Sequence, residues 1–309
     1  EIKIILVVRL DHIGDMVRAT SIPQLIKETY PNTKLIFLTT TVGAQLIENN
    51  PYVDEVVLFD PSWYGTGAHK TDGKSSGFGQ AVRLLKSRKI DVAILPRGDI
   101  RENLLARMAN IPFRVGYGIT GGSFLLSRAV RYRGHAHEDE HTMDILRAFG
   151  IEVDTLRPRI YFDDNVHEAS STIFSKSGMT PELRWVGVQM EAGTSAKEWD
   201  LRRINLFLSE CGTTLLNANL YFVGQNKGVG KILDELMSGP KNIPWVNLIG
   251  KTSLNDLSVL LSKSHAFVGF DSGPAHMAAA LGVPTLFIYS GTNDYDVWKP
   301  LAENATVFK

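Results

Sequence analysis

The residues of this chain that could do chemistry stand directly behind apolar runs that resemble buried strands. Asp15 lies in a Gly-Asp pair after the run at residues 4–8, at the start of a helical pattern that continues towards Tyr30. A carboxylate held there can act as a general base and take a proton from a substrate hydroxyl. Asp is also a common helix N-cap, so a purely structural role stays open. Arg9 and His12 on the same loop can orient a substrate or can simply be solvated.

A second polar group follows the apolar run at residues 185–189. The loop reads EAGTSAKEW, in which Thr194 and Ser195 offer hydroxyl groups and Lys197 offers a positive charge. Hydroxyls, backbone N–H groups and a lysine point charge all suit nucleotide phosphates. We therefore predict phosphate binding here. The structural alternative is a polar loop that leads into a helix capped by Asp200.

A third group lies in the stretch GFDSGPAHMAAALGVPT. Asp271, Ser272 and Gly273 form a turn after a strand, and Pro274 is a favoured first residue of a helix. The free N–H groups at a helix start attract anions, and the helix dipole adds to the attraction. His276 in the first turn can point towards such a ligand or pack within the fold, and Asp271 can serve only as a cap.

Three other patterns are set aside. Residues 250–252 read Gly-Lys-Thr, but Trp245 stands where a phosphate loop requires glycine. No G-x-G-x-x-G follows the first strand, which argues against a dinucleotide dehydrogenase. His135, His137 and His141 stand among acidic residues, which resembles a metal cluster. We interpret this segment instead as the acidic, solvated start of a helix, and we predict no metal.

Arginines are concentrated between residues 97 and 133. This stretch holds seven of them, including Arg97 and Arg101, against Asp99 and Glu102, for a local charge of +5. The excess is either a solvated face or a surface that recognises an anionic acceptor.

The elements that must position these residues form an α/β pattern, in which short β-branched runs alternate with helical patterns. Most of the predicted strands are continuous apolar runs, as expected where helices cover both faces of a parallel sheet. The predicted strands are residues 4–8, 35–39, 55–59, 91–95, 113–117, 185–189, 220–224, 246–250, 266–270 and 285–289.

The chain's length predicts two domains, because 309 residues exceed what one hydrophobic core usually supports. We place the boundary near residue 160, which gives domains 1–160 and 161–309. In parallel sheets, ligands bind beyond the carboxyl ends of the strands, so we expect the three polar groups to converge on a cleft between the domains. Residues 64–79, rich in Gly, Ser and Lys, are expected to form a long loop, either a lid over the acceptor or a disordered segment.

The composition excludes several classes of protein. The formal net charge is zero, so the overall balance does not call for nucleic acid or an anionic membrane. No stretch approaches the roughly 20 apolar residues needed to span a bilayer, and no signal peptide is evident. The single cysteine, Cys211, cannot form an internal disulfide, which favours a reducing compartment. We therefore expect a cytoplasmic protein.

The order of the motifs is similar to that of a known family. RLDHIGDMVRATSIPQLIKETYP, FRVGYG, HEDEHTMDILRAFG, AGTSAKEW and VGFDSGPAHMAAALGVPTLFIYSGTN, in this order, resemble the family 9 glycosyltransferases, which include the ADP-heptose:lipopolysaccharide heptosyltransferases of Gram-negative bacteria. The resemblance covers nearly the whole chain. It implies a GT-B fold of two Rossmann-like domains with a cleft between them, the acceptor on the N-terminal domain and the nucleotide-sugar on the C-terminal one. It also implies inverting transfer without an essential metal.

The resemblance carries over to particular residues. It implies that Asp15 is the catalytic base and that Lys197 contacts the donor phosphate. Many members hold the ribose with a glutamate after the strand matching residues 220–224, whereas this chain has Gln225 nearby, which leaves the nucleotide base open. The donor-binding residues expected are Thr194, Ser195, Lys197, Gln225, Asp271, Ser272, Gly273 and His276. The acceptor-binding residues expected are Arg9, His12, Arg97 and Arg101.

The predicted function is transfer of a heptose or related sugar from a nucleotide-sugar, expected to be ADP-heptose, to a hydroxyl of a glycan or glycolipid acceptor such as lipopolysaccharide core. We expect no cofactor, no nucleic-acid partner and no transmembrane segment, and the prediction leaves room for peripheral contact with the inner membrane. Two alternatives remain: a GT-B nucleotide-sugar epimerase, and a catalytically silent nucleotide-sugar-binding protein. The presence of both Asp15 and Lys197 disfavours a silent protein.

Overall fold

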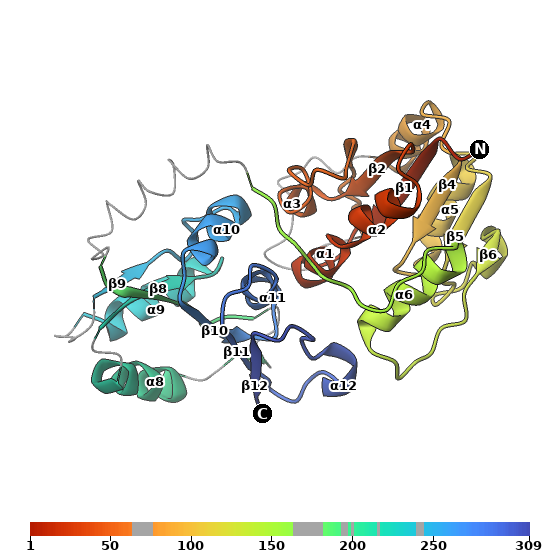
Figure 1. Ribbon diagram of the computed structural model, residues 1–309. Coiled ribbons are helices and arrows are strands. Elements are labelled where there is room, and N and C mark those ends of the chain that lie inside the picture. The colour runs from red at the N-terminus through yellow and green to blue at the C-terminus, as the bar shows by residue number, and fades with distance from the viewer. Residues whose placement is uncertain (64–76, 163–181, 193–196, 199–200, 215–216, 239–243) are drawn as a thin grey trace. The chain divides into compact units, whose positions relative to one another are not determined.

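Two six-stranded parallel sheets form the framework of the chain, one in each of two units (Figure 1). In this computed structural model, unit 1 is Glu1–Tyr161 and unit 2 is Phe162–Lys309. The structure describes all residues except 64–76, 163–181, 193–196, 199–200, 215–216 and 239–243. The division between the units falls one residue from the boundary expected from the sequence.

Unit 1 has the strand order β3-β2-β1-β4-β5-β6. Its central strands β1, β2 and β4 are apolar runs whose side chains are almost all buried on both faces of the sheet, as a parallel sheet between helices requires. The strands are β1 (Ile4–Arg9), β2 (Lys34–Thr39), β3 (Glu55–Leu58), β4 (Val92–Leu95), β5 (Phe113–Gly116) and β6 (Arg128–Ala129). The helices are α1 (Ile13–Ala19), α2 (Ile22–Thr29), α3 (Thr41–Ala44), α4 (Phe78–Lys86), α5 (Ile100–Met108) and α6 (Glu138–Phe149), with a 3₁₀ turn, η2 (Ser123–Leu125).

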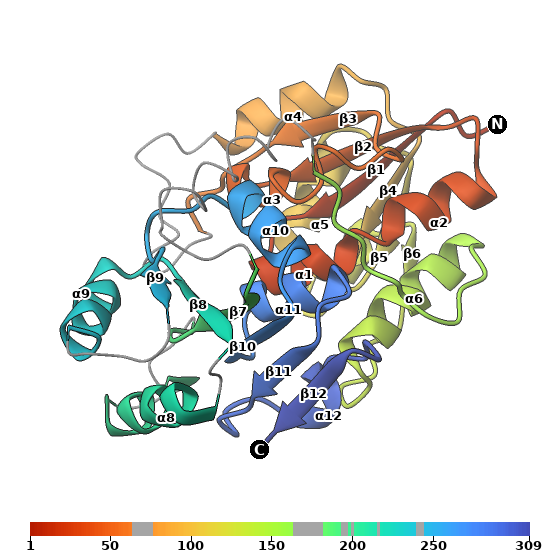
Figure 2. The same cartoon turned by 60° about the vertical axis from the view of Figure 1, so that its left-hand side comes forward.

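Helices cover both faces of the unit 1 sheet. On one face, Leu85 of α4 and Leu105 of α5 pack into a core with Leu6 and Val8 of β1, and Leu126 next to η2 joins them. On the other face lie α1, α2 and α6 (Figures 1 and 2). The loops after β1 and β4 therefore emerge between two helical layers.

The sheet of unit 2 has the same topology as that of unit 1, with the strand order β12-β11-β10-β7-β8-β9. Ile204 and Leu208 of α8 and Leu233 of α9 pack on Val188 and Phe222 to form the core on one face. The strands are β7 (Arg184–Gln189), β8 (Ala218–Val223), β9 (Trp245–Asn247), β10 (Ala266–Phe270), β11 (Thr285–Ile288) and β12 (Ala305–Phe308). The helices are α8 (Leu201–Thr214), α9 (Lys227–Leu236), α10 (Leu254–Ser262), α11 (Gly273–Ala280) and α12 (Tyr295–Trp298).

All ten strands predicted from the sequence are present, with ends displaced by up to three residues. The sequence missed β6 and β12, which lie at sheet edges. The capping box expected at Ser253 and Asp256 is confirmed at the start of α10. Gly282 follows the last residues of α11 with φ of 79°, as expected for a glycine behind a helix.

The prediction of one helix towards Tyr30 is wrong, because the chain forms two helices there. The hydroxyls of Thr20 and Ser21 donate to the carbonyls of Val17 and Arg18, and Pro23 follows with no N–H group to donate. These interactions end α1 and restart the chain as α2. In the part of the chain that is described, no helix combines the length and apolar character needed to cross a membrane.

Candidate active site

The polar residues singled out in the sequence gather at the same topological position in each unit. In unit 1, β1 and β4 are neighbours from which the sheet winds in opposite directions, and in unit 2 β7 and β10 hold that position. Loops that leave the carboxyl ends of such strands diverge and leave room for a ligand. Asp15 follows β1, Lys197 follows β7 and Asp271 follows β10. We describe the two clusters separately as the unit 1 half-site and the unit 2 half-site.

Asp15 is the third residue of α1, and the N-cap of this helix is His12. The interpretation of Asp15 as an N-cap is therefore wrong. Its side chain is 17% exposed, and its Oδ1 lies 3.5 Å from Nη2 of Arg9. Burial raises the pKa of Asp15 to about 6, with Arg9 opposing the rise and the nearby charge of Asp11 adding to it. A carboxyl group that titrates there is suited to accept a proton at neutral pH.

Arg9 lies at the centre of the unit 1 half-site. It is only 3% exposed, so the expectation of a solvated arginine is wrong. Its Nε is 2.6 Å from Oδ2 of Asp11, and its Nη2 is 3.8 Å from Oε1 of Glu138. Although burial opposes its charge, Asp11 and Asp15 raise the pKa of Arg9, so it remains a fixed cation. Arg9 thus holds three carboxylates in place.

A second arginine, Arg97, joins this cluster from the loop after β4. Its Nε is 2.8 Å from Oδ1 of Asp11, and its Nη1 is 3.5 Å from Oε1 of Glu102. Glu102 is 1% exposed, and burial together with the charge of Asp11 raises its pKa to about 8. Glu102 is therefore mostly protonated at neutral pH, which limits the negative charge around Asp15.

The other two predicted acceptor residues lie outside this cluster. Arg101 donates from Nε to Oδ1 of Asp99 at 2.9 Å, and its guanidinium lies 5.1 Å from the ring of Trp63. His12 is exposed at the start of α1. Arg101 is therefore engaged by the N-cap of α5 rather than by the cluster around Asp15.

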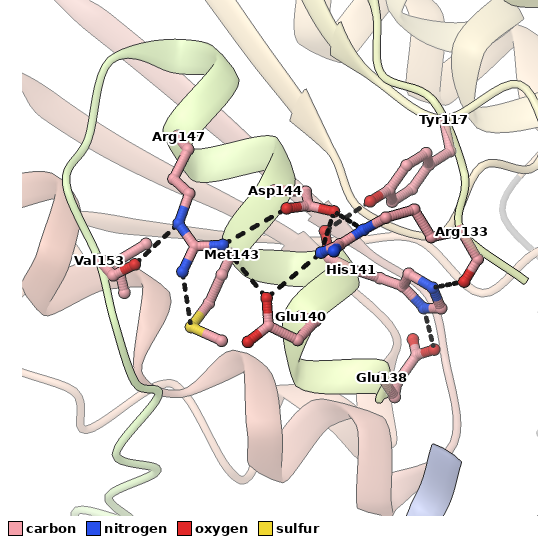
Figure 3. Close-up of polar contacts among 9 residues, drawn as sticks. All are labelled: Tyr117, Arg133, Glu138, Glu140, His141, Met143, Asp144, Arg147 and Val153. Atoms are coloured by element: carbon pink, nitrogen blue, oxygen red, sulfur yellow. Dashed lines mark hydrogen bonds and ion pairs between the residues drawn. The ribbon is translucent and has the colours of Figure 1, made fainter. Parts of the chain in front are cut away.

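The start of α6 contributes a buried histidine, His141, whose ring lies beside Glu138 (Figure 3). His141 is 2% exposed, with Nδ1 3.1 Å from Oε2 of Glu138 and Nε2 3.0 Å from the carbonyl oxygen of Arg133. Although burial disfavours a charged ring, these two acceptors raise the pKa of His141. Conversely, the His141 bond and Arg9 hold the pKa of Glu138 below its usual range despite burial. Glu138 therefore lies between Arg9 and His141, and it favours the protonated form of the His141 ring.

The helix start is thus buried and paired, and the expectation of a solvated segment is wrong for Asp139 and His141. His137 is the N-cap and accepts a hydrogen bond from the N–H of Asp139 at 3.1 Å. Arg133 and Arg147 bond to Glu140 on the outer side of α6 (Figure 3). Within the described residues, no three His, Cys, Asp or Glu side chains are grouped to hold a metal ion.

In the unit 2 half-site, Asp271 binds three donors. Lys197 Nζ lies 3.2 Å from its Oδ2, His276 Nε2 lies 3.2 Å from its Oδ1, and Asn293 Nδ2 donates to Oδ2 at 2.7 Å. Although burial opposes ionisation, His276 and Lys197 hold the pKa of Asp271 far below its usual range. The His276 ring also packs 5.2 Å from that of Phe287, so it both fills the fold and fixes Asp271.

The turn between β10 and α11 presents the start of a helix. Ser272, not Asp271, is the N-cap, so the interpretation of Asp271 as a cap is wrong. The Ser272 hydroxyl donates to Oε1 of Gln189 and to the carbonyl of Phe270 instead of capping the helix. The Ser272 side chain therefore accepts no hydrogen bond from the N–H groups in the first turn of α11. An anion site at a helix start requires that such N–H groups are not bonded to the capping side chain.

Glu191 is a residue that the sequence reasoning missed. It is buried after β7, and its carboxylate accepts hydrogen bonds from the backbone N–H groups of Gln225 and Asn226. A Cβ on Gly224 would lie 2.4 Å from Oε1 of Glu191, so the glycine permits this contact. The side chain of Gln225 is exposed beside this clamp. Thr194, Ser195 and Asp200 lie outside the described residues, as do residues 64–76 of the loop predicted at 64–79. The end of that prediction is wrong, because α4 already begins at Phe78.

Two α/β units, each built on a six-stranded parallel sheet, have the architecture of the GT-B fold. The family model described as glycosyltransferase family 9 (heptosyltransferase) matches residues 79–309, and the chain belongs to that family. It is therefore a glycosyltransferase, and the resemblance found in the sequence is confirmed.

Proteins of known sequence or structure are similar to this chain along nearly its whole length. Lipopolysaccharide heptosyltransferase 3 of Escherichia coli is 22% identical over 306 residues, which cover 96% of this chain and 85% of that protein. A family 9 glycosyl transferase from Veillonella parvula superposes with a TM-score of 0.84 at 19% identity, over 99% of this chain and 86% of the other. E. coli ADP-heptose lps heptosyltransferase II gives a TM-score of 0.78 at 20% identity, over 99% and 90%.

Proposed function

We propose that this protein transfers a heptose or a related sugar from a nucleotide-sugar to a hydroxyl of a glycan acceptor, with inversion and without a metal ion. The observation that carries the proposal is the environment of Asp15, a largely buried carboxylate beside Arg9 whose pKa is raised to about 6. The names of two of the family relatives support ADP-heptose as donor and lipopolysaccharide as acceptor.

Asp15 is the proposed general base. An acceptor hydroxyl is a weak nucleophile, so its proton must pass to the carboxylate as its oxygen bonds to the anomeric carbon. In the same displacement the bond from that carbon to the nucleoside diphosphate breaks, which inverts the configuration. General-base assistance of this kind contributes about 10²–10⁴-fold to the rate. Arg9 keeps the Asp15 carboxylate in place and stays charged throughout.

The unit 2 half-site is proposed to bind the leaving diphosphate. Lys197 supplies a positive charge, and the start of α11 supplies backbone N–H groups, so developing phosphate charge meets fixed donors without a metal. Asp271, itself fixed by His276 and Asn293, positions the lysine. Thr194, Ser195 and Gln225 complete the proposed donor set.

The acceptor is proposed to contact the unit 1 half-site. His12 is exposed there, whereas Arg9, Arg97 and Arg101 are all engaged by acids of the chain. The arginines of residues 97–133 motivate an acceptor with phosphate or carboxylate groups. A cytoplasmic location, expected from the lone cysteine, belongs to the same proposal.

The test compares Asp15→Asn with Glu28→Gln, a carboxylate-to-amide change on an exposed turn of α2. With ADP-heptose and a heptose-deficient lipopolysaccharide acceptor, Asp15→Asn should lose at least 100-fold in transfer while ADP-heptose still raises the melting temperature. Glu28→Gln should match the parent. Conversion of the donor to its epimer without acceptor would identify an epimerase, and stabilisation without any turnover would identify a silent binding protein.

A further inference from the structure

The helical layer that contains α4 and α5 presents apolar side chains on its outer side. Ile100, Leu104 and Met108 of α5 are 36%, 38% and 48% exposed. Their spacing of four residues places them along one side of the helix. The opposite side of α5, with Leu105 and Ala109, packs into the core against the sheet. Helix α5 therefore buries one apolar side and exposes another.

Neighbouring segments add to this apolar stripe. Phe124 in η2 is 82% exposed and Ile119 is 48% exposed. A Cβ on Gly122 would lie 2.7 Å from Cγ1 of Ile100, so the chain before η2 rests directly on the first turn of α5. On the other side, α4 packs against α5 and exposes Leu84. We call this surface the α4–α5 face and define its apolar part as Leu84, Ile100, Leu104, Met108, Ile119 and Phe124.

The segment that carries the α4–α5 face is rich in positive charge, and Glu55, an acid that meets it from β3, is paired with Arg88 and Lys34. Residues 77–133, all of which are described, contain eleven Lys and Arg but only three acids. Asp99 and Glu102 are buried, and Asp91 is half-buried and accepts hydrogen bonds from the N–H groups of Lys3 and Ile4. No acid in this stretch is exposed, although the chain as a whole is neutral. The exposed bases include Arg83, Lys86, Lys89, Arg107, Arg128 and Arg131.

An exposed apolar patch with a rim of one charge marks an interaction surface, and its chemistry selects the partner. A bilayer with anionic headgroups offers both complements, because acyl chains accept apolar side chains and phosphates attract lysine and arginine. We propose that the α4–α5 face docks on an anionic bilayer, with Phe124 and the α5 stripe at the headgroup–acyl boundary. Docking does not depend on the transfer reaction, but it would bring the chain to a lipid-borne acceptor.

The test is co-sedimentation of the whole chain with vesicles of phosphatidylglycerol and phosphatidylcholine, compared with phosphatidylcholine alone. The partition coefficient should be at least tenfold higher on the anionic vesicles and should fall in 0.5 M salt. A Leu104→Ser and Phe124→Ser double variant should lose at least tenfold. Leu206→Ser is the matched control, since Leu206 is 62% exposed on α8 of unit 2 and should change nothing.

Three results would overturn the proposal: no partitioning at all, equal partitioning on neutral and anionic vesicles, or equal loss in the double variant and the control. A dimer in solution that the double variant alone dissociates would instead assign the face to a second copy of the chain. Both replaced side chains are substantially exposed, so circular dichroism and the melting temperature should stay unchanged.

Discussion

Glu138 lies between His141 and Arg9, with Oε2 3.1 Å from Nδ1 of His141 and Oε1 3.8 Å from Nη2 of Arg9. The same Arg9 nitrogen lies 3.5 Å from Oδ1 of Asp15. Helix α6 is thereby connected to the proposed base through alternating charges that are mostly shielded from water. Because a buried charge interacts strongly with its neighbours, removing the charge of Glu138 should change the pKa of Asp15.

The first prediction concerns the pH dependence of transfer. The pKa of Asp15 is raised to about 6, so its carboxylate forms as the pH rises through that value. We expect kcat/KM to increase with pH up to about 7 with a midpoint near 6, since only the ionised form can take the proton. Initial rates measured between pH 4.5 and 8 test this. A midpoint near 4, the value of an unperturbed Asp, would contradict it.

Asp15→Asn should also stabilise the protein at neutral pH. A raised pKa means that the folded state favours the protonated carboxyl, so ionisation costs stability as the pH rises from the unfolded pKa of about 4 to the folded one of about 6. The amide avoids this cost, which is on the order of 1–3 kcal/mol. Urea unfolding should show the gain at pH 7.5 and a much smaller one at pH 4. If Asp15→Asn is less stable than the parent at pH 7.5, ionisation of Asp15 does not reduce the stability of the fold.

Arg9 is predicted to set both the stability and the acidity of the unit 1 half-site. Arg9→Met removes the cation paired with Asp15 and leaves Asp11 paired with Arg97 alone, so it should destabilise the fold by about 3–5 kcal/mol. Arg83→Met on the exposed side of α4 is the control and should cost under about 0.5 kcal/mol. Arg9→Lys keeps a positive charge but loses the planar guanidinium that contacts several carboxylates at once. The ionised form of Asp15 is then less stabilised, so the pKa of Asp15 should rise. The pH midpoint of kcat/KM should then move above 6, which a purely structural role of Arg9 would not produce.

Glu138 and Glu140, two residues apart on α6, provide a matched pair. Glu138 raises the pKa of Asp15 by repulsion, so Glu138→Gln should move the pH midpoint of transfer below 6. The same variant should lower the pKa of His141, which proton NMR of its ring can follow. Glu140 binds Arg133 and Arg147 on the outer side of the helix, so Glu140→Gln should leave the midpoint in place. Equal shifts in both variants would exclude a path through Glu138.

Sequence reasoning found those site residues whose motif is local. Apolar runs predict the strands β1, β7 and β10, and the loops or helix starts behind them carry Asp15, Lys197 and Asp271. These three residues also belong to the motifs that resemble the family. Glu138 was missed because it reaches Arg9 only where α6 and β1, which are distant in the chain, come together. Glu102 pairs with Arg97 five residues before it and was missed because the sequence does not show that it is buried. The N-cap of α1 was misplaced because the helix begins three residues earlier than an N-cap at Asp15 would place it. Periodicity fixes the elements, whereas pairing between elements decides which charges meet.

Asp271 leads to the last prediction, on the acid stability of unit 2. Its pKa in the fold lies well below the ordinary value of about 3.8, so its contribution is present above that value and is lost as the pH falls below it. At pH 7, Asp271→Asn should cost roughly 2–4 kcal/mol, because Lys197 and His276 lose a charged partner. Between pH 4 and pH 2.5 the difference from the parent should shrink.

Urea unfolding followed by tryptophan fluorescence can measure this, since four of the five tryptophans, Trp185, Trp199, Trp245 and Trp298, belong to unit 2. Asp296→Asn is the control, because that side chain is 80% exposed and pairs only at the surface with Lys299. A difference between Asp271→Asn and the parent that stays constant with pH would mean that Asp271 stabilises unit 2 through packing. Convergence at acid pH would instead attribute its contribution to the charge that also holds Lys197 for the donor phosphate.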